Sequence, residues 1–147
     1  METLFTDEWF MKEALKEAQK AFDEGEVPVG AVVVLDNKII GKGHNLTERL
    51  HDVTAHAEMQ AITAAANYLG AKYLTECKLY VSLEPCNMCA GAIYWAQLSE
   101  LIIGAPDTKR GFMATESKML HPKTVVKKGI LEEACANLMK DFFKQLR

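Results

Sequence analysis

Residues 29–42 read VGAVVVLDNKIIGK, the clearest structural pattern in the chain. Positions 29–35 form a continuous apolar run rich in β-branched side chains, which is typical of a strand covered on both sides. Asp36 and Asn37 separate this run from a second extended stretch at 38–42. Because a two-residue connection of this kind predicts a tight hairpin, we expect a β-hairpin whose first strand lies inside a sheet.

The segments on either side of the hairpin alternate between helix and strand patterns. Before it, apolar residues recur every three or four positions and predict an amphipathic helix over 7–22, with Asp7 as N-cap and Gly25 at its end. After it, we expect helices over 56–68, 86–97 and 131–145, and strands over 78–83 and 101–104. Residues 107–128 show no clear pattern. The alternation predicts one layered α/β domain over 1–147, with later strands parallel.

The composition is that of an average soluble domain, with 49% hydrophobic and 25% charged residues in a chain of 147. No apolar run approaches the roughly 20 residues that cross a bilayer. The first residues lack the basic segment and apolar core of a secretory signal. We therefore expect a cytoplasmic protein without a membrane partner, whose four cysteines stay reduced.

The net charge of −3 hides an uneven distribution. Residues 1–106 carry 8 basic against 15 acidic side chains, a balance of −7, whereas residues 107–147 carry 9 against 5, a balance of +4. A protein that coats nucleic acid non-specifically would be basic throughout, and we expect no DNA partner. A bound polyanion should contact the C-terminal third of the chain.

Two short motifs, His56-Ala-Glu58 and Pro85-Cys86-Asn-Met-Cys89, each open an expected helix. Cys86 and Cys89 lie three positions apart, so both sulfurs project from one face of a first helical turn. The free N–H groups at a helix start favour the thiolates that bind metal. With His56 the set offers three ligands, and catalytic zinc sites keep a fourth position open. The pattern favours one catalytic zinc ion per chain.

Glu58 lies two positions from His56, and we expect it to shuttle protons rather than to bind metal. A carboxylate beside a metal can take a proton from water and pass it to a leaving amine. The two motifs together match the H-x-E…P-C-x-x-C signature of the zinc nucleobase deaminases. A redox or structural role for the cysteine pair remains an alternative. A structural zinc would need a fourth ligand, for which the candidates are Cys77, Cys135, His44 and His51.

Beyond these motifs, almost the whole chain resembles the bacterial tRNA adenosine deaminases of the TadA type. The matching segments include EVPVGAV at 26–32, TAHAE at 54–58, LYVSLEPCNMCAGA at 79–92, HP at 121–122 and DFF at 141–143. The resemblance implies a three-layer α/β/α cytidine-deaminase-like fold, with a five-stranded mixed sheet flanked by helices. It also implies a homodimer that converts the wobble adenosine in a tRNA anticodon loop to inosine and releases ammonia.

The resemblance also implies roles for single residues. The family's zinc ligands and proton shuttle match the residues already singled out, which are His56, Cys86, Cys89 and Glu58. Asn45 matches a residue that reads the flipped base, and Val29 matches a wall of the pocket. Asp107 matches a residue near the sugar-phosphate of the target nucleotide.

Pro106 departs from the pattern, because the family commonly has an arginine there. Lys109 and Arg110 follow closely and could supply the missing phosphate contact. Two other hypotheses stay open. A deaminase of a free nucleobase or nucleoside, of the cytosine or guanine type, would share the metal motif. A non-catalytic binding subunit would be expected to have lost the shuttle, and Glu58 is present.

Simpler structural roles also apply to the secondary residues. Asn45 could merely turn the chain after its strand. Of Phe142 and Phe143, we expect at least one ring to pack in the core. Lys127 and Lys128 are most simply interpreted as a solvated turn.

Overall fold

The hairpin predicted from residues 29–42 is present in the computed structural model, which describes residues 5–114 and 118–146. Strands β1 (Gly30–Leu35) and β2 (Lys38–His44) pair antiparallel across Asp36 and Asn37. Both turn residues have positive φ angles, 50° and 62°, as the tightest hairpin turns require. β1 also pairs with β3 (Lys78–Leu83), so it is an inner strand as predicted.

The strands form one five-stranded sheet in the order β2-β1-β3-β4-β5. β4 (Glu100–Ala105) lies parallel to β3, and β5 (Val125–Lys128) lies parallel to β4. The prediction of parallel later strands is confirmed. β5 escaped prediction because all four of its residues are exposed, which leaves no buried face to mark a pattern. Lys127 and Lys128 lie in this edge strand, so their interpretation as a turn was wrong.

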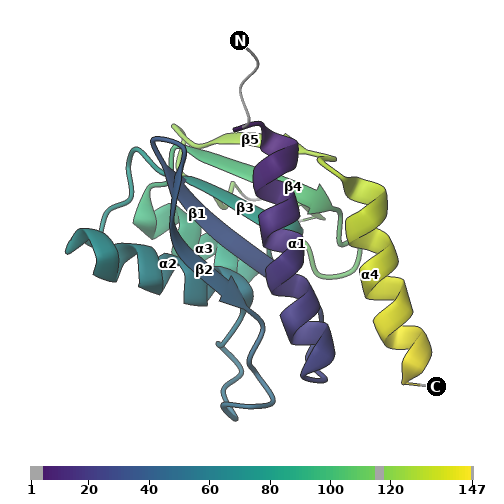
Figure 1. Cartoon of the computed structure of the whole chain (residues 1–147). Coiled ribbons are helices and arrows are strands. Elements are labelled where there is room, and N and C mark those ends of the chain that lie inside the picture. Colours follow the sequence, from purple (N-terminus) through teal and green to yellow (C-terminus); the bar gives the residue numbers. More distant parts are fainter. Residues whose placement is uncertain (1–4, 115–117, 147) are drawn as a thin grey trace.

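Helices cover both faces of the sheet (Figure 1). They are α1 (Asp7–Asp23), α2 (Ala57–Leu69), α3 (Asn87–Ala96) and α4 (Glu132–Gln145), with a short 3-10 helix η1 (Phe112–Ala114). Neighbouring residues of β1 face opposite sides, since side chains alternate along a strand. Val32 belongs to the buried cluster that contains Phe10 of α1, whereas Val33 belongs to the one that contains Ala61 of α2. The predicted three-layer α/β/α arrangement is confirmed, with α1 and α4 on one face and α2 and α3 on the other (Figure 1).

The start of α1 differs from the prediction by one residue. The Thr6 hydroxyl, not Asp7, accepts the capping hydrogen bond from the Trp9 amide at 3.1 Å. Asp7 is the first helical residue, and its carboxylate accepts a hydrogen bond from the Tyr80 hydroxyl at 2.7 Å. This contact ties α1 to β3. Within the described residues, no helix is long and apolar enough to cross a membrane.

Gly41 and Gly43 let α2 lie directly on β2. A Cβ atom at Gly43 would overlap the carbonyl oxygen of Ala57, and one at Gly41 would crowd the backbone of Ala61. Only glycine leaves this space, because any other residue adds a carbon that faces the helix. The close contact holds the first turn of α2, which begins directly after His56, against the sheet.

Candidate active site

The segments that carry the predicted site residues meet at one end of the sheet, where the strands terminate. β2, β3 and β4 finish at this end and β1 begins there, because β1 is antiparallel to both of its neighbours. Val29 precedes β1, Asn45 follows β2, Cys86 follows β3 and Asp107 follows β4. Open α/β sheets usually bind ligands outside the carboxyl ends of their parallel strands.

The structure brings the three predicted metal ligands together. His56 is the N-cap of α2, Cys86 is the N-cap of α3, and Cys89 lies in the first turn of α3. The Nδ1 atom of His56 is 3.7 Å from the Cys86 sulfur and 3.5 Å from the Cys89 sulfur. Ligands bound tetrahedrally to zinc at about 2.0 to 2.3 Å are themselves roughly 3.5 Å apart. The group therefore fits a zinc ion.

None of the four candidates for a fourth ligand joins this group. Cys77 packs in the core layer under α2 and α3, and Cys135 packs in the layer under α1 and α4. The Nε2 atom of His44 lies 2.8 Å from a Glu24 carboxylate oxygen, and His51 is exposed on a loop. In the described part of the chain, the group of potential metal ligands consists of three residues. A structural zinc with four protein ligands is therefore not supported.

The polar contacts of the group favour a thiolate. Hydrogen bonds with the Cys89 thiol and the His56 ring lower the pKa of Cys86 to about 3. The pKa of Cys89 is raised because its thiol donates to Cys86 and is fully buried. The pKa of His56 is raised by its hydrogen bond with Cys86. A thiolate is the form of cysteine that binds a metal cation.

Glu58 lies beside this group, in the first turn of α2. Its side chain is 3% exposed, and burial raises the pKa of its carboxyl to about 7. A carboxyl group with a pKa near neutrality can both take up and release a proton. This is the property required by the shuttle role predicted for Glu58.

Asn45 and Val29 are neighbours at the same end of the sheet. The Asn45 amide donates to the Val29 carbonyl at 3.2 Å, and Asn45 is only 7% exposed. Its side-chain oxygen has no hydrogen-bond partner among the described residues. A merely turn-forming asparagine would use this oxygen on a nearby backbone group. A buried polar atom without a partner is costly, and it indicates a place where a ligand donor can bind.

Asp107, Lys109 and Arg110 share one loop. The Asp107 carboxylate accepts hydrogen bonds from the Lys109 amide at 3.1 Å and the Arg110 amide at 3.0 Å, so it shapes the loop itself. Both basic residues are exposed. The loop lies against the metal-ligand segment, because Gly111 forms a β-bridge with Cys86.

Three buried carboxylates, Glu17, Glu26 and Glu84, were not singled out from the sequence, and two of them hold loops. Glu84, 7% exposed, accepts hydrogen bonds from the Asp107 amide at 3.1 Å and the Met113 amide at 2.9 Å. Glu26, 0% exposed, binds the connection between β2 and α2 in a similar way. The available signal was an acidic residue within an otherwise apolar segment, as in EVPVGAV and YVSLEP.

Comparisons with known proteins agree with this geometry. The sequence profile of the MafB19-like deaminases matches residues 5–147. The tRNA-specific adenosine deaminase of Bacillus subtilis (strain 168) is 45% identical over 147 residues, which cover 96% of this chain and 91% of that protein. The chain belongs to the tRNA-specific adenosine deaminase family.

Solved structures related to this family share the fold. One comes from a study of A-to-I editing by tRNA:A34 deaminases at the wobble position of transfer RNA, and it is 42% identical with a TM-score of 0.83. The match covers 88% of this chain and 97% of that one. A guanine deaminase from Bacillus subtilis is 44% identical with a TM-score of 0.67, covering 70% of this chain and 66% of that one. The adenosine deaminase match confirms the predicted cytidine-deaminase-like fold.

Proposed function

We propose that this chain is a zinc-dependent hydrolytic deaminase that acts on the wobble adenosine of a tRNA anticodon loop. The observation that carries the proposal is the group of His56, Cys86 and Cys89 with the buried Glu58 beside it. In the reaction, the oxygen of water bonds to C6 of adenine, the bond from C6 to the amino nitrogen breaks, and inosine and ammonia result. The names of the relatives support tRNA as the substrate.

The roles of the residues follow from their positions. His56, Cys86 and Cys89 would hold the zinc, which when bound is a Lewis acid that makes water nucleophilic near neutral pH. Glu58 takes a proton from the attacking water and delivers it to the departing amino group. The free amide oxygen of Asn45 accepts a hydrogen bond from the base.

RNA recognition extends this site toward the C-terminal third of the chain. Lys109 and Arg110 are exposed on the loop that lies against Cys86, in the segment with a balance of +4. We propose that they contact phosphates next to the target base, in place of the arginine replaced by Pro106. An unpaired anticodon loop suits this site, because its bases can turn outward at little cost.

The test is ammonia release from a panel of substrates. The panel contains an anticodon stem-loop with adenosine at the wobble position, and free adenosine, cytosine and guanine. The metal content of the protein is measured alongside. We expect the stem-loop to be deaminated in strong preference, activity to be lost on chelation, and zinc to restore it. Equal or faster turnover of a free base would overturn the tRNA assignment.

A free-base deaminase is the second candidate, and the similarity to the Bacillus subtilis guanine deaminase favours guanine among the free bases. Both candidates use the same metal group and the same shuttle. The guanine arm of the panel separates them, since rapid release of ammonia from guanine with an inert stem-loop would support this candidate alone.

We also propose that the protein is a homodimer. Tyr94 and Trp95 of α3 form an exposed aromatic pair with ring centroids 5.5 Å apart, and Trp95 is 71% exposed. Met88, also exposed, lies on the same helix. Exposed apolar groups of this size are common at protein interfaces. Light scattering should give twice the mass of the chain, and Trp95→Lys should reduce the measured mass to that of one chain.

The cytoplasmic location and the lack of a DNA partner remain predictions.

A further inference from the structure

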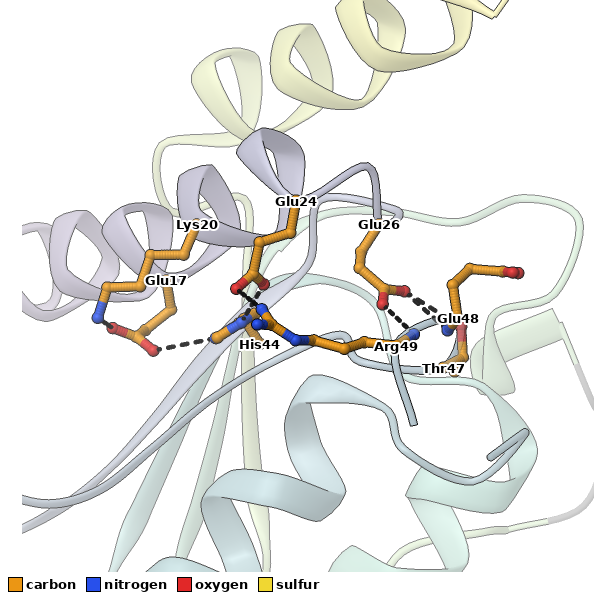
Figure 2. Close-up of polar contacts among 8 residues, drawn as sticks. All are labelled: Glu17, Lys20, Glu24, Glu26, His44, Thr47, Glu48 and Arg49. Carbon is orange, nitrogen blue, oxygen red and sulfur yellow. Dashed lines mark hydrogen bonds and ion pairs between the residues drawn. The ribbon is translucent and has the colours of Figure 1, made fainter. Parts of the chain in front are cut away.

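A buried carboxylate connects the segments on either side of the β1–β2 hairpin (Figure 2). Glu26 is 0% exposed, and Figure 2 shows its side chain pointing toward residues 47–49. Its Oε1 atom accepts hydrogen bonds from the Glu48 amide at 3.0 Å and the Thr47 hydroxyl at 3.5 Å. Its Oε2 atom accepts from the Arg49 amide at 2.8 Å. One side chain therefore satisfies three donors of a turn about twenty positions further along the chain.

This turn begins the connection from β2 to α2. Asn45, with its free amide oxygen, and His56, the metal ligand, are the two ends of the connection. Hydrogen bonds run through it without a break from the turn held by Glu26 to His56. They join the Asp52 amide to the Thr47 carbonyl at 3.0 Å, the Thr54 amide to the Asp52 carboxylate at 2.8 Å, and the His56 amide to the Thr54 carbonyl at 2.8 Å.

The other end of the connection is also held. The Asn45 amide donates to Val29, and the Leu46 amide donates to the Ala55 carbonyl at 2.9 Å. Glu26 and Val29 belong to the same short segment before β1. The hydrogen bonds of Glu26 and the Asn45–Val29 hydrogen bond therefore both join this segment to the chain that follows β2. The turn held by Glu26 is thus linked to Asn45 through the segment before β1, and to His56 through the hydrogen bonds at Thr47, Asp52 and Thr54.

More exposed ion pairs lie beside this contact (Figure 2). Glu24 contacts the Arg49 guanidinium at 2.6 Å and the His44 ring at 2.8 Å. The Arg49 side chain is 65% exposed, and exposed ion pairs contribute little. A buried carboxylate bound by backbone amides is different, because losing those donors leaves a buried charge without partners. Glu26, rather than Glu24, is therefore the residue that holds the turn.

We propose that Glu26 is a positioning residue of the active site, whose carboxylate holds the 45–56 connection so that Asn45 and His56 keep their separation. Glu26 is enclosed, so it contacts neither substrate nor metal. The inference rests on the proposed deaminase function, in which Asn45 holds the base and His56 holds the zinc. A misplacement of about 1 Å between such groups can cost roughly 100-fold in rate.

The test compares Glu26→Gln with Arg49→Ala. Glutamine keeps the shape of Glu26 but turns one acceptor oxygen into an NH₂ group that faces an amide donor. Alanine at 49 removes the exposed ion pair and keeps the backbone amide that Glu26 binds. Hydrogen exchange of peptides covering 45–56, the metal content, and kcat and KM on the anticodon stem-loop are measured on the zinc-loaded proteins, well below their unfolding temperatures.

For Glu26→Gln, we expect exchange at 47–49 to rise at least about tenfold and kcat to fall roughly 10- to 100-fold, with KM within about threefold. Arg49→Ala should change each quantity less than about threefold. If Glu26→Gln does not fold, Glu26→Asp takes its place. Aspartate keeps the charge with a shorter reach. Its kcat should also fall while its KM stays nearly constant, but the fall in kcat should be smaller.

Two results would overturn the inference. One is unchanged exchange at 47–49 in the folded Glu26 variants, and the other is faster exchange with unchanged kcat. Failure of the proposed function is distinguishable, because wild-type protein would then leave the stem-loop unmodified. The variants would in that case be compared on the member of the panel that wild-type protein does deaminate.

Discussion

Glu26 and Glu58 are both buried carboxyl groups, but Glu26 binds the turn after β2 and Glu58 lies in the first turn of α2, so their surroundings suit them to different tasks. The oxygens of Glu26 are occupied by donors from a turn, which holds both partners in place. Glu58 lies beside the metal-ligand group, and burial raises the pKa of its carboxyl to about 7. One carboxylate therefore holds structure, and the other is able to move a proton.

Replacing Glu58 by alanine tests its role at the scale of one residue. We expect deamination of the stem-loop to fall roughly 10²- to 10⁴-fold, the usual contribution of a positioned general acid and base. Zinc content and the circular dichroism spectrum should not change, because Glu58 is not a ligand in the three-residue group. Glu76→Ala, in an exposed loop, is the control. Unchanged deamination in Glu58→Ala would overturn the shuttle role of Glu58, whereas an unchanged biological function after deamination is lost would favour a non-catalytic binding protein.

Cys135 gives the stability of the protein a dependence on pH. It is 2% exposed, and burial raises the pKa of its thiol from 9.0 to about 11. Between these values the thiol ionises in the unfolded chain but not in the folded one, which favours unfolding. The free energy of unfolding should therefore fall by up to about 1.4 kcal/mol per pH unit between pH 9 and about 11, with little dependence on this thiol outside that range.

Cys135→Ala should remove this part of the pH dependence of stability. Urea unfolding of both proteins from pH 8 to 11 measures it, because the cavity left by the substitution lowers stability equally at every pH. The curve of the variant should be flatter above pH 9, and parallel curves would contradict the assignment.

At the scale of elements, the site depends on how closely α2 lies on β2. Gly43 faces the Ala57 carbonyl and the Gln60 side chain at the start of the helix. The same helix start carries His56 and Glu58. The contact between strand and helix therefore sets where His56 and Glu58 lie relative to α3.

Gly43→Ala should push the start of α2 away from the sheet. We expect the free energy of unfolding to fall by about 1–3 kcal/mol, the usual cost of overpacking, and the activity to fall with it. Gly91→Ala in α3 is the matched control, because a Cβ there meets nothing within 4 Å. Alanine in that helix should be neutral or stabilise by up to ~1 kcal/mol. Urea midpoints measure the stability of both variants. If the two substitutions change stability equally, the close contact between β2 and α2 is not the cause.

At the scale of the whole molecule, charge is divided along the chain, with −7 over residues 1–106 and +4 over residues 107–147. The sheet brings the start of the positive segment to the metal-ligand group through the bridge between Gly111 and Cys86. Lys109 and Arg110 therefore present positive charge to a polyanionic substrate on the loop beside the site. This distribution favours binding in one orientation.

Lys109→Ala and Arg110→Ala test this arrangement. Each should raise KM for the stem-loop at low salt and reduce the slope of log KM against log salt by about 0.7, the value for one phosphate contact on a single strand. The rate at saturation should change little, since neither side chain belongs to the metal-ligand group. Lys12→Ala, exposed on α1, is the control. An unchanged slope in both loop variants would place the phosphate contacts elsewhere.

The elements that have a buried face, and the three residues of the metal-ligand group, could be predicted from local sequence patterns. The hairpin at 29–42 follows from an apolar run and a two-residue turn, and Cys86 and Cys89 converge because three positions separate them at a helix start. These signals are local. The exposed strand β5 carries no such signal, and the cap at Thr6 rather than Asp7 depends on the backbone at the helix start.

The partners of the buried acids Glu26 and Glu84 depend on how distant segments pack together. Glu26 binds residues 47–49, and Glu84 binds the amides of Asp107 and Met113, in each case more than twenty positions away. No local pattern specifies such a partner, because the order and direction of the strands decide which loops meet at one end of the sheet. The sequence thus determined which side chains can hold a metal and move a proton, and the packing of the sheet determined which carboxylates hold the loops around them.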